Sequence, residues 1–460
     1  RACVGMGAMA GDGAGTVLRR FGVDPVTRGW AVVTSAGVVR LGLGFVASLL
    51  VARALGPANF GVYAVLGATV SIAGTLAEGG LTEAAVLRIA SVWPSAREAA
   101  ARRARSFIWL RVGLSAVVVG LGCALAGVIA STLLNGIDAG LLRWALLGVV
   151  ATAASGALSA VLQATGGFGR MSSLTLINTG LTAALALLLA AIGQLNLLSA
   201  LIVLGIGTSL VTFGAAARML PAGWRVGVPS LTDVQAEGKR LLEVGRWLWI
   251  ASLFAMLTLN AEVLLLNQWT ALALVGAYAL ALNLATKADV VNQSLYTVLL
   301  PGVAGLDLDV KARTNSSRRD YLRRGLLRSG GICLVLLILI PLAQPLIVLI
   351  YGPAYAPSVI FFQLLLGVMM FDVLLTPFLL LPLAYGQARV LAAAEAARAV
   401  TLVAVAVALI PVYGPFGAVA ARFASRVAGA LLVLAALYVS GRSSGQKFDV
   451  QHKEPASVLD

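Results

Sequence analysis

Twelve long apolar stretches cover most of this chain, and they constrain its fold more than any other feature of the sequence. A helix of about 20 apolar residues crosses a hydrocarbon core of about 30 Å at a rise of 1.5 Å per residue. The sequence therefore predicts an all-α polytopic membrane protein with about twelve spans. The expected spans are 30–52, 60–90, 106–130, 141–163, 172–193, 197–219, 246–266, 271–302, 326–350, 359–384, 390–412 and 416–440.

The composition supports a membrane protein and argues against several other classes. The 460 residues are 60% hydrophobic and only 12% charged, which does not describe a soluble surface. The net charge of +15 lies mostly in loops, where membrane orientation and anionic lipid explain it better than nucleic acid does. The sequence has no P-loop, its one histidine is His452 in the tail, and its three cysteines lack a metal-ligand spacing. We therefore expect a transporter that is not an enzyme and has no metal or organic cofactor.

The distribution of basic residues predicts the orientation in the membrane. The connections 91–105, 220–246 and 305–328 contain four, four and seven Lys or Arg residues, whereas the other side offers only Arg53 and Arg143 near helix ends. Basic loops remain in the cytoplasm, so both termini are expected there. Residues 1–29 include no apolar region followed by a cleavage site, and we interpret them as an arm before an uncleaved first helix.

A polar segment at 220–245 divides the chain into two halves, 30–219 and 246–440, and a cytoplasmic tail follows at 441–460. The halves carry related short sequences: GVYA at 61–64 corresponds to GAYA at 276–279. A Gly and an Arg three residues later follow both the fourth and the tenth spans. These matches predict a parallel repeat, with two pseudo-symmetric six-helix lobes around a central cavity.

Charged residues near the middle of the spans are the first candidates for function. A charge at the centre of a spanning helix costs about 2.5–3.5 kcal/mol, so Arg40, Lys287, Asp289 and Asp372 together imply on the order of 10 kcal/mol unless they pair, face water or bind a ligand. Arg40 is expected near mid-depth. We favour a hydrated cavity for it over a pair with a carboxylate on a neighbouring helix.

The eighth span is the most polar of the twelve. At 100° per residue, Asn283 and Lys287 share one face, while Asp289, Asn292 and Gln293 share another. Lys287 and Asp289 are about 200° apart around the helix and should not neutralise each other. So broad a polar surface predicts a helix that faces water.

The second half also carries Arg422 and Arg426, one helical turn apart, and two like charges on one face need a nearby anion. Asp372 is expected to supply it in a structural ion pair. Alternatively, Asp372 or Asp289 titrates and couples transport to an ion gradient, and Glu262 is a weaker candidate for this role. Both interpretations stay open.

Several segments resemble the polysaccharide-biosynthesis flippases, the Wzx-type members of the multidrug/oligosaccharidyl-lipid/polysaccharide exporter superfamily. ARALGPANFGVY at 52–63 resembles the opening signature of that family, and AEGGL at 77–81 with Arg88 resembles its acidic-Gly-Leu…Arg segment. Glu78 stands where Asp is commoner, and Gly79 is an addition. Looser matches are LP at 300–301, YGPAY at 351–355, YGQAR at 385–389 and IPVYG at 410–414.

The resemblance implies two six-helix lobes around a V-shaped, often cationic cavity lined by helices one, two, seven and eight. It also implies transport of undecaprenyl-diphosphate-linked oligosaccharide across the bacterial cytoplasmic (inner) membrane, for cell-surface polymers such as lipopolysaccharide or exopolysaccharide. A diphosphate in a low-dielectric cavity needs fixed cations. We expect Arg40 and Lys287 to bind it, with Arg88 and Arg53 as entrance and exit cations, although Arg88 near the interface is equally placed to reach lipid headgroups.

The expected partners are this lipid-linked oligosaccharide, membrane lipids, and polymerase or glycosyltransferase proteins, but not nucleic acid. A proton or sodium gradient is the expected source of energy. Three alternatives stay open: an ion-coupled multidrug antiporter on the same scaffold, a peptidoglycan lipid-precursor flippase, and a membrane glycosyltransferase or polymerase. Basic residues at mid-depth disfavour the first, and short, weakly charged external loops disfavour the last.

Overall fold

The computed structural model describes residues 25–93, 95–220, 224, 229–290, 292, 295, 299, 315–384 and 388–451, and every regular element in these ranges is a helix. In the first half these are α2 Pro25–Glu78, α3 Leu81–Ala90, α4 Arg97–Ala124, α5 Ala126–Thr132, α6 Ala139–Ala164, α7 Phe168–Ala191, α8 Leu197–Ser199, the π-helix η1 Ala200–Gly207 and α9 Thr208–Met219. In the second half they are α11 Leu231–Trp269, α12 Leu272–Ala288, α14 Asn315–Tyr351, the 3₁₀-helix η2 Pro353–Tyr355, α15 Ser358–Leu379, α16 Leu381–Ala384, α17 Ala388–Tyr413 and α18 Pro415–Gln451.

The described helices account for the predicted spans. Ten segments are long and apolar enough to cross a membrane, and α12 is a shorter apolar helix. The first segment, Gly37–Glu78, contains two spans, because α2 is broken at Gly56, where φ is +66° and Pro57 follows. With the two arms of α2 counted separately and α12 added, the segments match the twelve expected spans. The chain is a multi-pass membrane protein.

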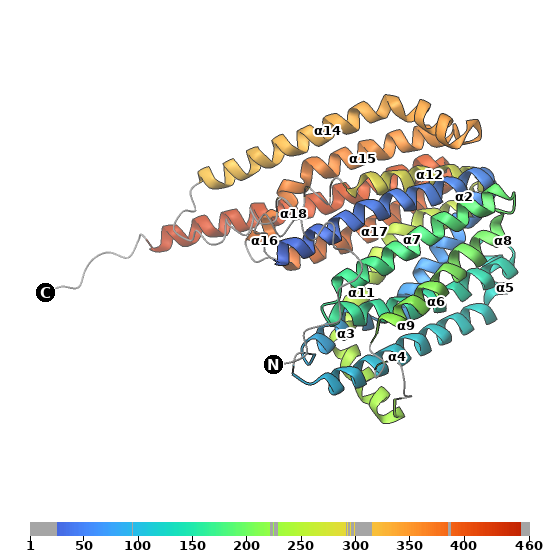
Figure 1. Ribbon diagram of the computed structural model, residues 1–460. Helices are drawn as coiled ribbons and strands as arrows, with labels where there is room; N and C mark the ends of the chain where they lie inside the picture. The colour runs from blue at the N-terminus through green and yellow to red at the C-terminus, as the bar shows by residue number, and fades with distance from the viewer. Residues whose placement is uncertain are drawn as a thin grey trace.

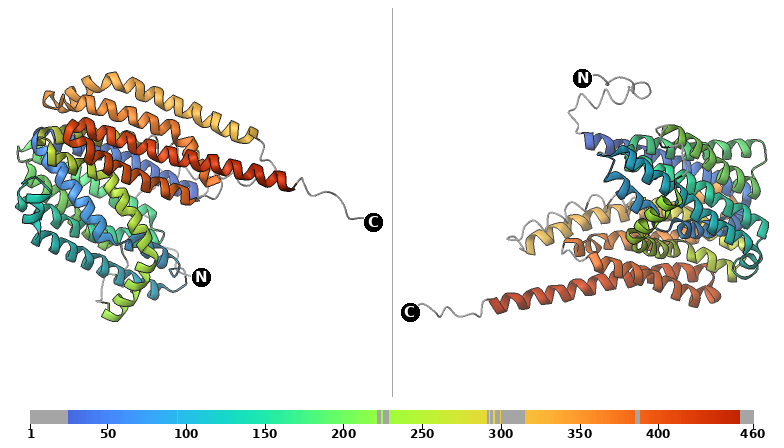
Figure 2. Two further views of the ribbon diagram at one scale, coloured as in Figure 1. Left: turned by 180° about the vertical axis from the view of Figure 1, so that it is seen from behind. Right: turned by 90° about the horizontal axis from the view of Figure 1, so that it is seen from below.

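The helices form two groups, which we call the N-lobe (α2 to α9) and the C-lobe (α11 to α18). Figure 1 shows that the two lobes lie close together at the end where α2 bends and diverge towards the end where the two chain termini lie. We call these the loop end and the terminus end of the bundle. Figure 2 shows the same arrangement from two other sides, with α18 extending well beyond the other helices at the terminus end.

Several helices extend beyond the predicted spans at the terminus end. α11 begins at Leu231, inside the segment predicted as a linker, and α18 continues to Gln451, inside the predicted tail. The Ser230 side chain caps α11 by accepting a hydrogen bond from the Asp233 amide at 3.1 Å. Good helix formers such as Glu237, Lys239 and Leu241 follow, so the polar segment continues the membrane helix. The length of the apolar stretch therefore underestimates the length of these helices.

Two glycines bring the lobes into backbone contact at the loop end. A Cβ on Gly61 of α2 would overlap the Leu272 carbonyl oxygen, and a Cβ on Gly276 of α12 would overlap the Pro57 carbonyl oxygen. These are the glycines that begin the two corresponding GVYA and GAYA sequences. The Tyr355 hydroxyl also donates to the Ala52 carbonyl across the lobes at 2.7 Å. Small residues thus permit a close helix crossing here.

A second contact joins the lobes nearer the terminus end. Gly79 and Gly80 both have positive φ, +59° and +66°, and they separate α2 from α3, as the sequence predicts for a bend. Gly80 lies directly against the backbone of Gly245 in α11. The Trp249 indole donates to the Thr75 carbonyl at 2.9 Å beside it. The side of the molecule formed by α2, α3 and α11 is therefore joined near both ends.

We expect Gly61→Ala to destabilise the protein by about 1–3 kcal/mol, because the added methyl would meet backbone atoms that no rotamer change can move. Gly67→Ala, in the same helix, is the matched control, since its Cβ would have nothing within 4 Å. Thermal unfolding of both purified variants in detergent measures the difference. Equal melting temperatures for the two variants would contradict the close crossing.

Candidate functional site

The first arm of α2 and the helix α12 meet in a polar contact between the lobes. The Ser48 hydroxyl of α2 donates to Oδ1 of Asn283 in α12 at 3.1 Å. The Lys287 ammonium donates to the same oxygen from one helical turn further along α12. Asn283 and Lys287 therefore share a face, as their spacing predicts, and that face is turned towards the N-lobe. We call these three residues and Arg40 the α2–α12 site.

Both cations of this site lie on the same side of the Ser48–Asn283 contact. The helices are antiparallel, because Pro57 lies against Gly276 while Ser48 lies against Asn283. Lys287 is one turn from Asn283 towards the terminus end, about 6 Å along the axis. Arg40 is two turns from Ser48 in the same direction, about 12 Å.

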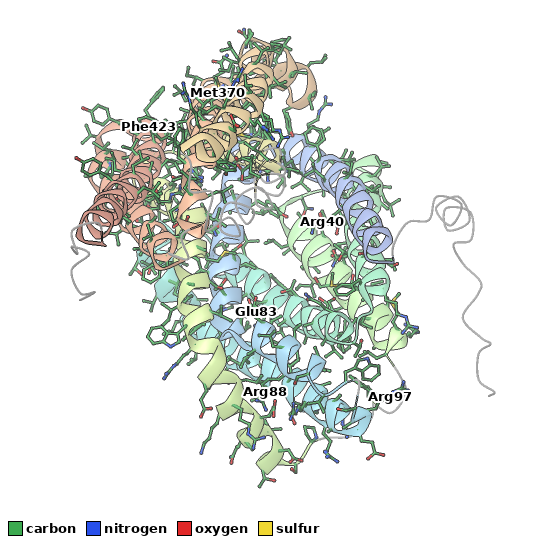
Figure 3. All side chains as sticks on the ribbon, turned by 90° about the vertical axis from the view of Figure 1, so that its left-hand side faces the viewer. Arg40, Glu83, Arg88, Arg97, Met370 and Phe423 are labelled. Atoms are coloured by element: carbon green, nitrogen blue, oxygen red, sulfur yellow. The ribbon has the colours of Figure 1, made fainter. Side chains whose placement is uncertain are left out.

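Neither cation has an acidic partner among the residues that the structure describes. Arg40 is exposed, and no ion pair or hydrogen bond of its guanidinium to a described residue is present. Figure 3, seen from the terminus end, shows the position of Arg40 on α2. Lys287 is half-buried, and its one described contact is neutral Asn283. Two positive charges without counter-ions favour a nearby anion.

The other two basic candidates differ from each other. Arg53 is exposed near the loop end, without a described partner. Arg88 of α3 instead forms a two-pronged ion pair with Glu237 of α11, at 2.8 and 3.2 Å. Arg88, which the sequence suggests as an entrance cation, is therefore bound to a carboxylate of the protein. Because Glu237 lies in the segment predicted as a linker, no sequence pattern places it beside α3.

A fully buried ion pair lies in the C-lobe between α11 and α18. Both oxygens of the Glu262 carboxylate accept from the Arg422 guanidinium at 2.8–3.1 Å, and the Tyr278 hydroxyl donates to the same carboxylate. Glu262 has no exposed surface. Arg422 therefore pairs with Glu262 and not with Asp372, which corrects the expectation that Asp372 balances both arginines. The partners are 160 residues apart, and no sequence pattern links them.

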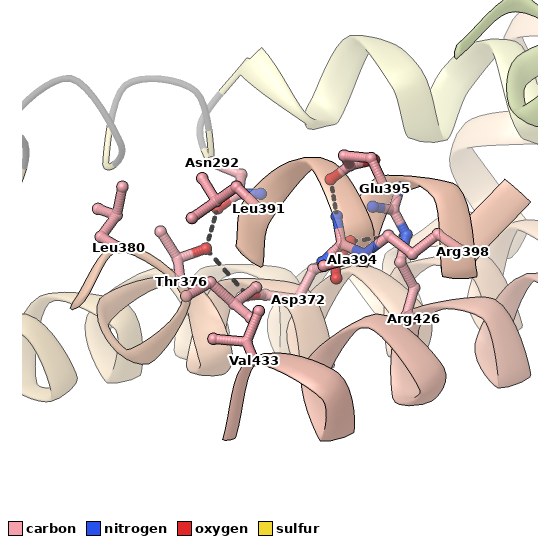
Figure 4. Close-up of a pocket in the computed structure, with 11 residues that line it drawn as sticks. Asn292, Asp372, Thr376, Leu380, Leu391, Ala394, Glu395, Arg398, Arg426 and Val433 are labelled. Atoms are coloured by element: carbon pink, nitrogen blue, oxygen red, sulfur yellow. Dashed lines mark hydrogen bonds and ion pairs between the residues drawn. The ribbon is translucent and has the colours of Figure 1, made fainter. Parts of the chain in front are cut away.

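Asp372 of α15 balances the second arginine. Its carboxylate lies 3.0 Å from the Arg426 guanidinium, while Asp372 itself is only 8% exposed. A cavity of about 160 Å³ lies beside the pair, and Figure 4 shows the residues that line it. Glu395 and Arg398 of α17, paired with each other at 2.7 Å, also line this cavity.

Asp289 is the C-cap of α12, and Asn292 lies just beyond the end of that helix; both border cavities of the C-lobe. The Asn292 amide donates to Asp289 at 3.4 Å, and Asp289 borders a second cavity, of about 80 Å³, with Asp372, Arg422 and Arg426. Gln293, the other polar residue predicted to share a face with Asp289, lies outside the described residues. The helix α12 thus lies between a basic α2–α12 site and a C-lobe region in which acids and arginines are present in equal number.

One membrane-embedded charge of the N-lobe was not singled out from the sequence. Arg111 lies in α4 with an 11% exposed side chain, 3.9 Å from the Glu78 carboxylate at the end of α2. A lone arginine inside the third apolar stretch was the signal that could have found it. Among the described residues there is no group of three or more His, Cys, Asp and Glu side chains that could hold a metal ion.

Comparison with known proteins gives a family match and several similar folds. A family model described as polysaccharide biosynthesis protein matches residues 26–306. A structure of the lipid II flippase MurJ in an inward closed conformation has a TM-score of 0.67 at 12% identity, covering 93% of this chain and 94% of that one. An inward-facing multidrug resistance MATE family transporter of the MOP superfamily has a TM-score of 0.64 at 15% identity, covering 89% and 98%. No curated protein matches the sequence.

Glu262→Gln should destabilise the protein by about 3–5 kcal/mol, because it leaves the Arg422 charge buried without its counter-ion. Glu395→Gln is the matched control: the Glu395 side chain is 67% exposed, and an exposed pair contributes about 0–1 kcal/mol. The measurement is the thermal unfolding temperature of each variant in detergent. If Glu262→Gln unfolds at the temperature of Glu395→Gln, the buried pair does not stabilise the C-lobe.

Proposed function

Because the chain belongs to the polysaccharide biosynthesis protein family, we propose that it is a flippase and not an enzyme. Its cargo is an oligosaccharide linked to a lipid, undecaprenyl diphosphate. The protein moves this cargo from the cytoplasmic to the outer leaflet for the synthesis of a cell-surface polysaccharide. The observation that carries the proposal is the α2–α12 site, where Arg40 and Lys287 have no acidic partner among the described side chains.

The chemistry of these two cations suits a diphosphate. A diphosphate presents several anionic oxygens, and charge-assisted hydrogen bonds to Lys or Arg are strong where water is scarce. Arg40 and Lys287 come from different lobes, so a bound diphosphate would draw the lobes together. In this mechanism the sugar stays in water, the prenyl chain stays in the bilayer, and only the headgroup needs protein charges.

Alternating access would use the contacts that the lobes make through glycines. Gly61 against Gly276, and Gly80 against Gly245, are backbone contacts of small area, about which two rigid lobes can rock. The Arg88–Glu237 pair then joins the lobes on the α3–α11 side, so Arg88 serves as an interlobe tie in place of the entrance cation expected from the sequence. Arg53, which is exposed at the loop end, keeps its proposed role as an exit cation.

We assign the driving force to a proton or sodium gradient that acts through Asp289, at the end of α12, and Asp372 of α15, which line the same C-lobe cavity. The buried Glu262 is bound to Arg422, so we propose a structural role for it. The proposed location is the bacterial inner membrane with both termini in the cytoplasm. Membrane lipids are immediate partners, and polymerase and glycosyltransferase proteins are the proposed functional partners.

Two related functions share the scaffold, since the similar folds include a multidrug transporter and a lipid II flippase. The unpaired basic residues of the α2–α12 site disfavour a cationic drug as cargo. A peptidoglycan lipid precursor is the second candidate, and a flipping assay that offers both lipid-linked cargoes separates the two.

In proteoliposomes, Arg40→Ala and Lys287→Met should each slow the flipping of a fluorescent undecaprenyl-diphosphate-linked oligosaccharide by about tenfold to a hundredfold, from the loss of about 1.5–3 kcal/mol per charge-assisted hydrogen bond. Arg102→Ala is the matched control, because it removes an exposed arginine of α4, which is not part of the site. Wild-type rates in both site variants, at equal reconstitution, would disprove the assignment.

The orientation is tested separately with reporter fusions in bacteria. Alkaline phosphatase inserted at Asn135 or Gly193 should be active, because both lie at the loop end, which we place outside the cytoplasm. A green fluorescent protein fused after Asp460 should fluoresce. An inactive phosphatase at both loop positions, with normal expression, would contradict the orientation.

A further inference from the structure

At the loop end, each lobe contacts the other through the loop between its third and fourth spans (Figure 1). In the N-lobe this loop connects α5 to α6, and its Asn135 amide donates to the Asn267 carbonyl of α11 at 3.0 Å. In the C-lobe the loop connects α14 to α15, and its Tyr355 hydroxyl donates to the Ala52 carbonyl of α2 at 2.7 Å. We call these two interlobe hydrogen bonds the N-latch and the C-latch.

The two latches are equivalent in the internal repeat. Ala52 lies nine residues before Gly61, and Asn267 lies nine residues before Gly276. Gly61 and Gly276 begin the corresponding GVYA and GAYA sequences, and each packs against the backbone of the other helix. The two acceptors therefore occupy the same position in the two halves, and the two donors come from the same loop of the two halves. The lobes exchange one hydrogen bond in each direction.

Local geometry positions the donor and the acceptor of the N-latch. Asn135 has a φ of +51°, in the left-handed region that Asn adopts more readily than most other residues, and Gly136 follows with a φ of +80°. The Asn267 carbonyl is among the last four of α11, which have no amide partner within the helix. The Gln268 side chain also donates to the Leu133 carbonyl of the same N-lobe loop. The end of α11 is thus bound to this loop at two adjacent residues.

The C-latch lies within an aromatic contact between the lobes. Tyr355 is 1% exposed, and its ring lies 6.2 Å from Phe60 of α2 and 6.0 Å from Tyr351 of α14. Tyr351 in turn contacts Phe45 of α2 at 6.5 Å. These rings fix the direction of the Tyr355 hydroxyl and exclude water from it, which strengthens its hydrogen bond.

Beside each latch lies a buried polar group that has no hydrogen-bond partner among the described residues. The Asn267 side chain is such a group: the residue is 1% exposed, and only its backbone carbonyl takes part in the N-latch. The Tyr351 hydroxyl, next to the C-latch, is the other. A buried polar group without a partner destabilises the state that buries it. Both groups would reach water if the lobes separated here, so both oppose closure.

We propose that the loop end is a balanced outer gate, which the two latches close and which the unpaired Asn267 amide and Tyr351 hydroxyl oppose. The favourable and unfavourable contributions are similar in size, so both states of the gate are populated. Because each latch joins the lobes directly, both latches break when the lobes separate at this end. This inference concerns the motion of the lobes, and it goes beyond the proposed cargo.

A distance between the lobes tests the gate without any cargo. Spin labels are attached to single cysteines at Gln194 in the N-lobe and Tyr413 in the C-lobe, two exposed positions at the loop end, after the native cysteines are replaced by alanine. Pulsed electron spin resonance of the full chain in lipid nanodiscs gives the populations of the short, closed distance and the long, open distance. The labelled protein with intact latches should show both distances.

Loss of either latch should favour the open gate. Tyr355→Phe removes only the donor hydroxyl. Asn135→Gly removes the donor amide, and glycine adopts the left-handed conformation of this position without strain. Each variant should raise the ratio of open to closed protein about threefold to tenfold, and the two effects should multiply in the double variant.

Two neighbouring substitutions are the matched controls, and they should act in the opposite direction. Tyr351→Phe is the same chemical change as Tyr355→Phe, one turn away in the same aromatic contact, but it removes the unpaired hydroxyl. Asn267→Leu keeps the branching of the side chain and the backbone carbonyl of the N-latch, and it removes the unpaired amide. Each control should lower the ratio of open to closed protein by about threefold or more.

The outcomes decide the proposal whatever the cargo. A single distance in every variant, a shift in only one of two folded latch variants, or equal shifts in Tyr351→Phe and Tyr355→Phe would overturn the gate. If one latch variant does not fold, as its elution profile in detergent shows, the other is compared with its own control in the same way. Opposite shifts in a protein that fails to flip lipid-linked oligosaccharide would support the gate and reject only the flippase function.

Discussion

The cost of an unbalanced charge in a low-dielectric interior governs this structure. In the C-lobe the protein itself supplies the counter-ions. Glu262 pairs with Arg422 at 2.8 Å, and Asp372 pairs with Arg426 at 3.0 Å, each across different helices. At the α2–α12 site this cost is not met by any described residue, since Arg40 and Lys287 have no carboxylate partner among them. The same physical rule thus distinguishes a lobe whose buried charges are paired from an interlobe site whose two cations have no described counter-ion.

The helix α12 links these two environments. Its Asn283–Lys287 face contacts α2, while Asp289 at its C-terminal end lines a C-lobe cavity and accepts from Asn292, which in turn accepts from Thr376. Its other end is fixed against α2 by backbone contact at Gly276, where no side chain intervenes. The helix therefore joins a basic contact with the N-lobe to a mixed-charge region of the C-lobe, and it is held against α2 at a glycine.

Much of this fold is predictable from the sequence because membrane spans are read from apolar length alone. The shared face of Asn283 and Lys287 on α12 and the bend at Gly79–Gly80 also follow from local rules, helical periodicity and the conformational freedom of glycine. The ion pairs, in contrast, do not follow from local rules. Glu262 and Arg422 are 160 residues apart, and Glu237 reaches Arg88 only because α11 begins 15 residues before its apolar part. Which charges meet depends on tertiary packing, so the sequence could place Asp372 beside the two arginines without assigning Arg422 and Arg88 to their partners.

The central claim is that Arg40 and Lys287 await a diphosphate between the lobes. A structure of the full chain in a lipid nanodisc with an undecaprenyl-diphosphate-linked sugar tests it most directly. The account predicts density for the diphosphate within hydrogen-bond distance of both Arg40 and Lys287, on the terminus-end side of the Ser48–Asn283 contact. Density for the diphosphate elsewhere, with these two side chains bound to carboxylates of the protein, would contradict it.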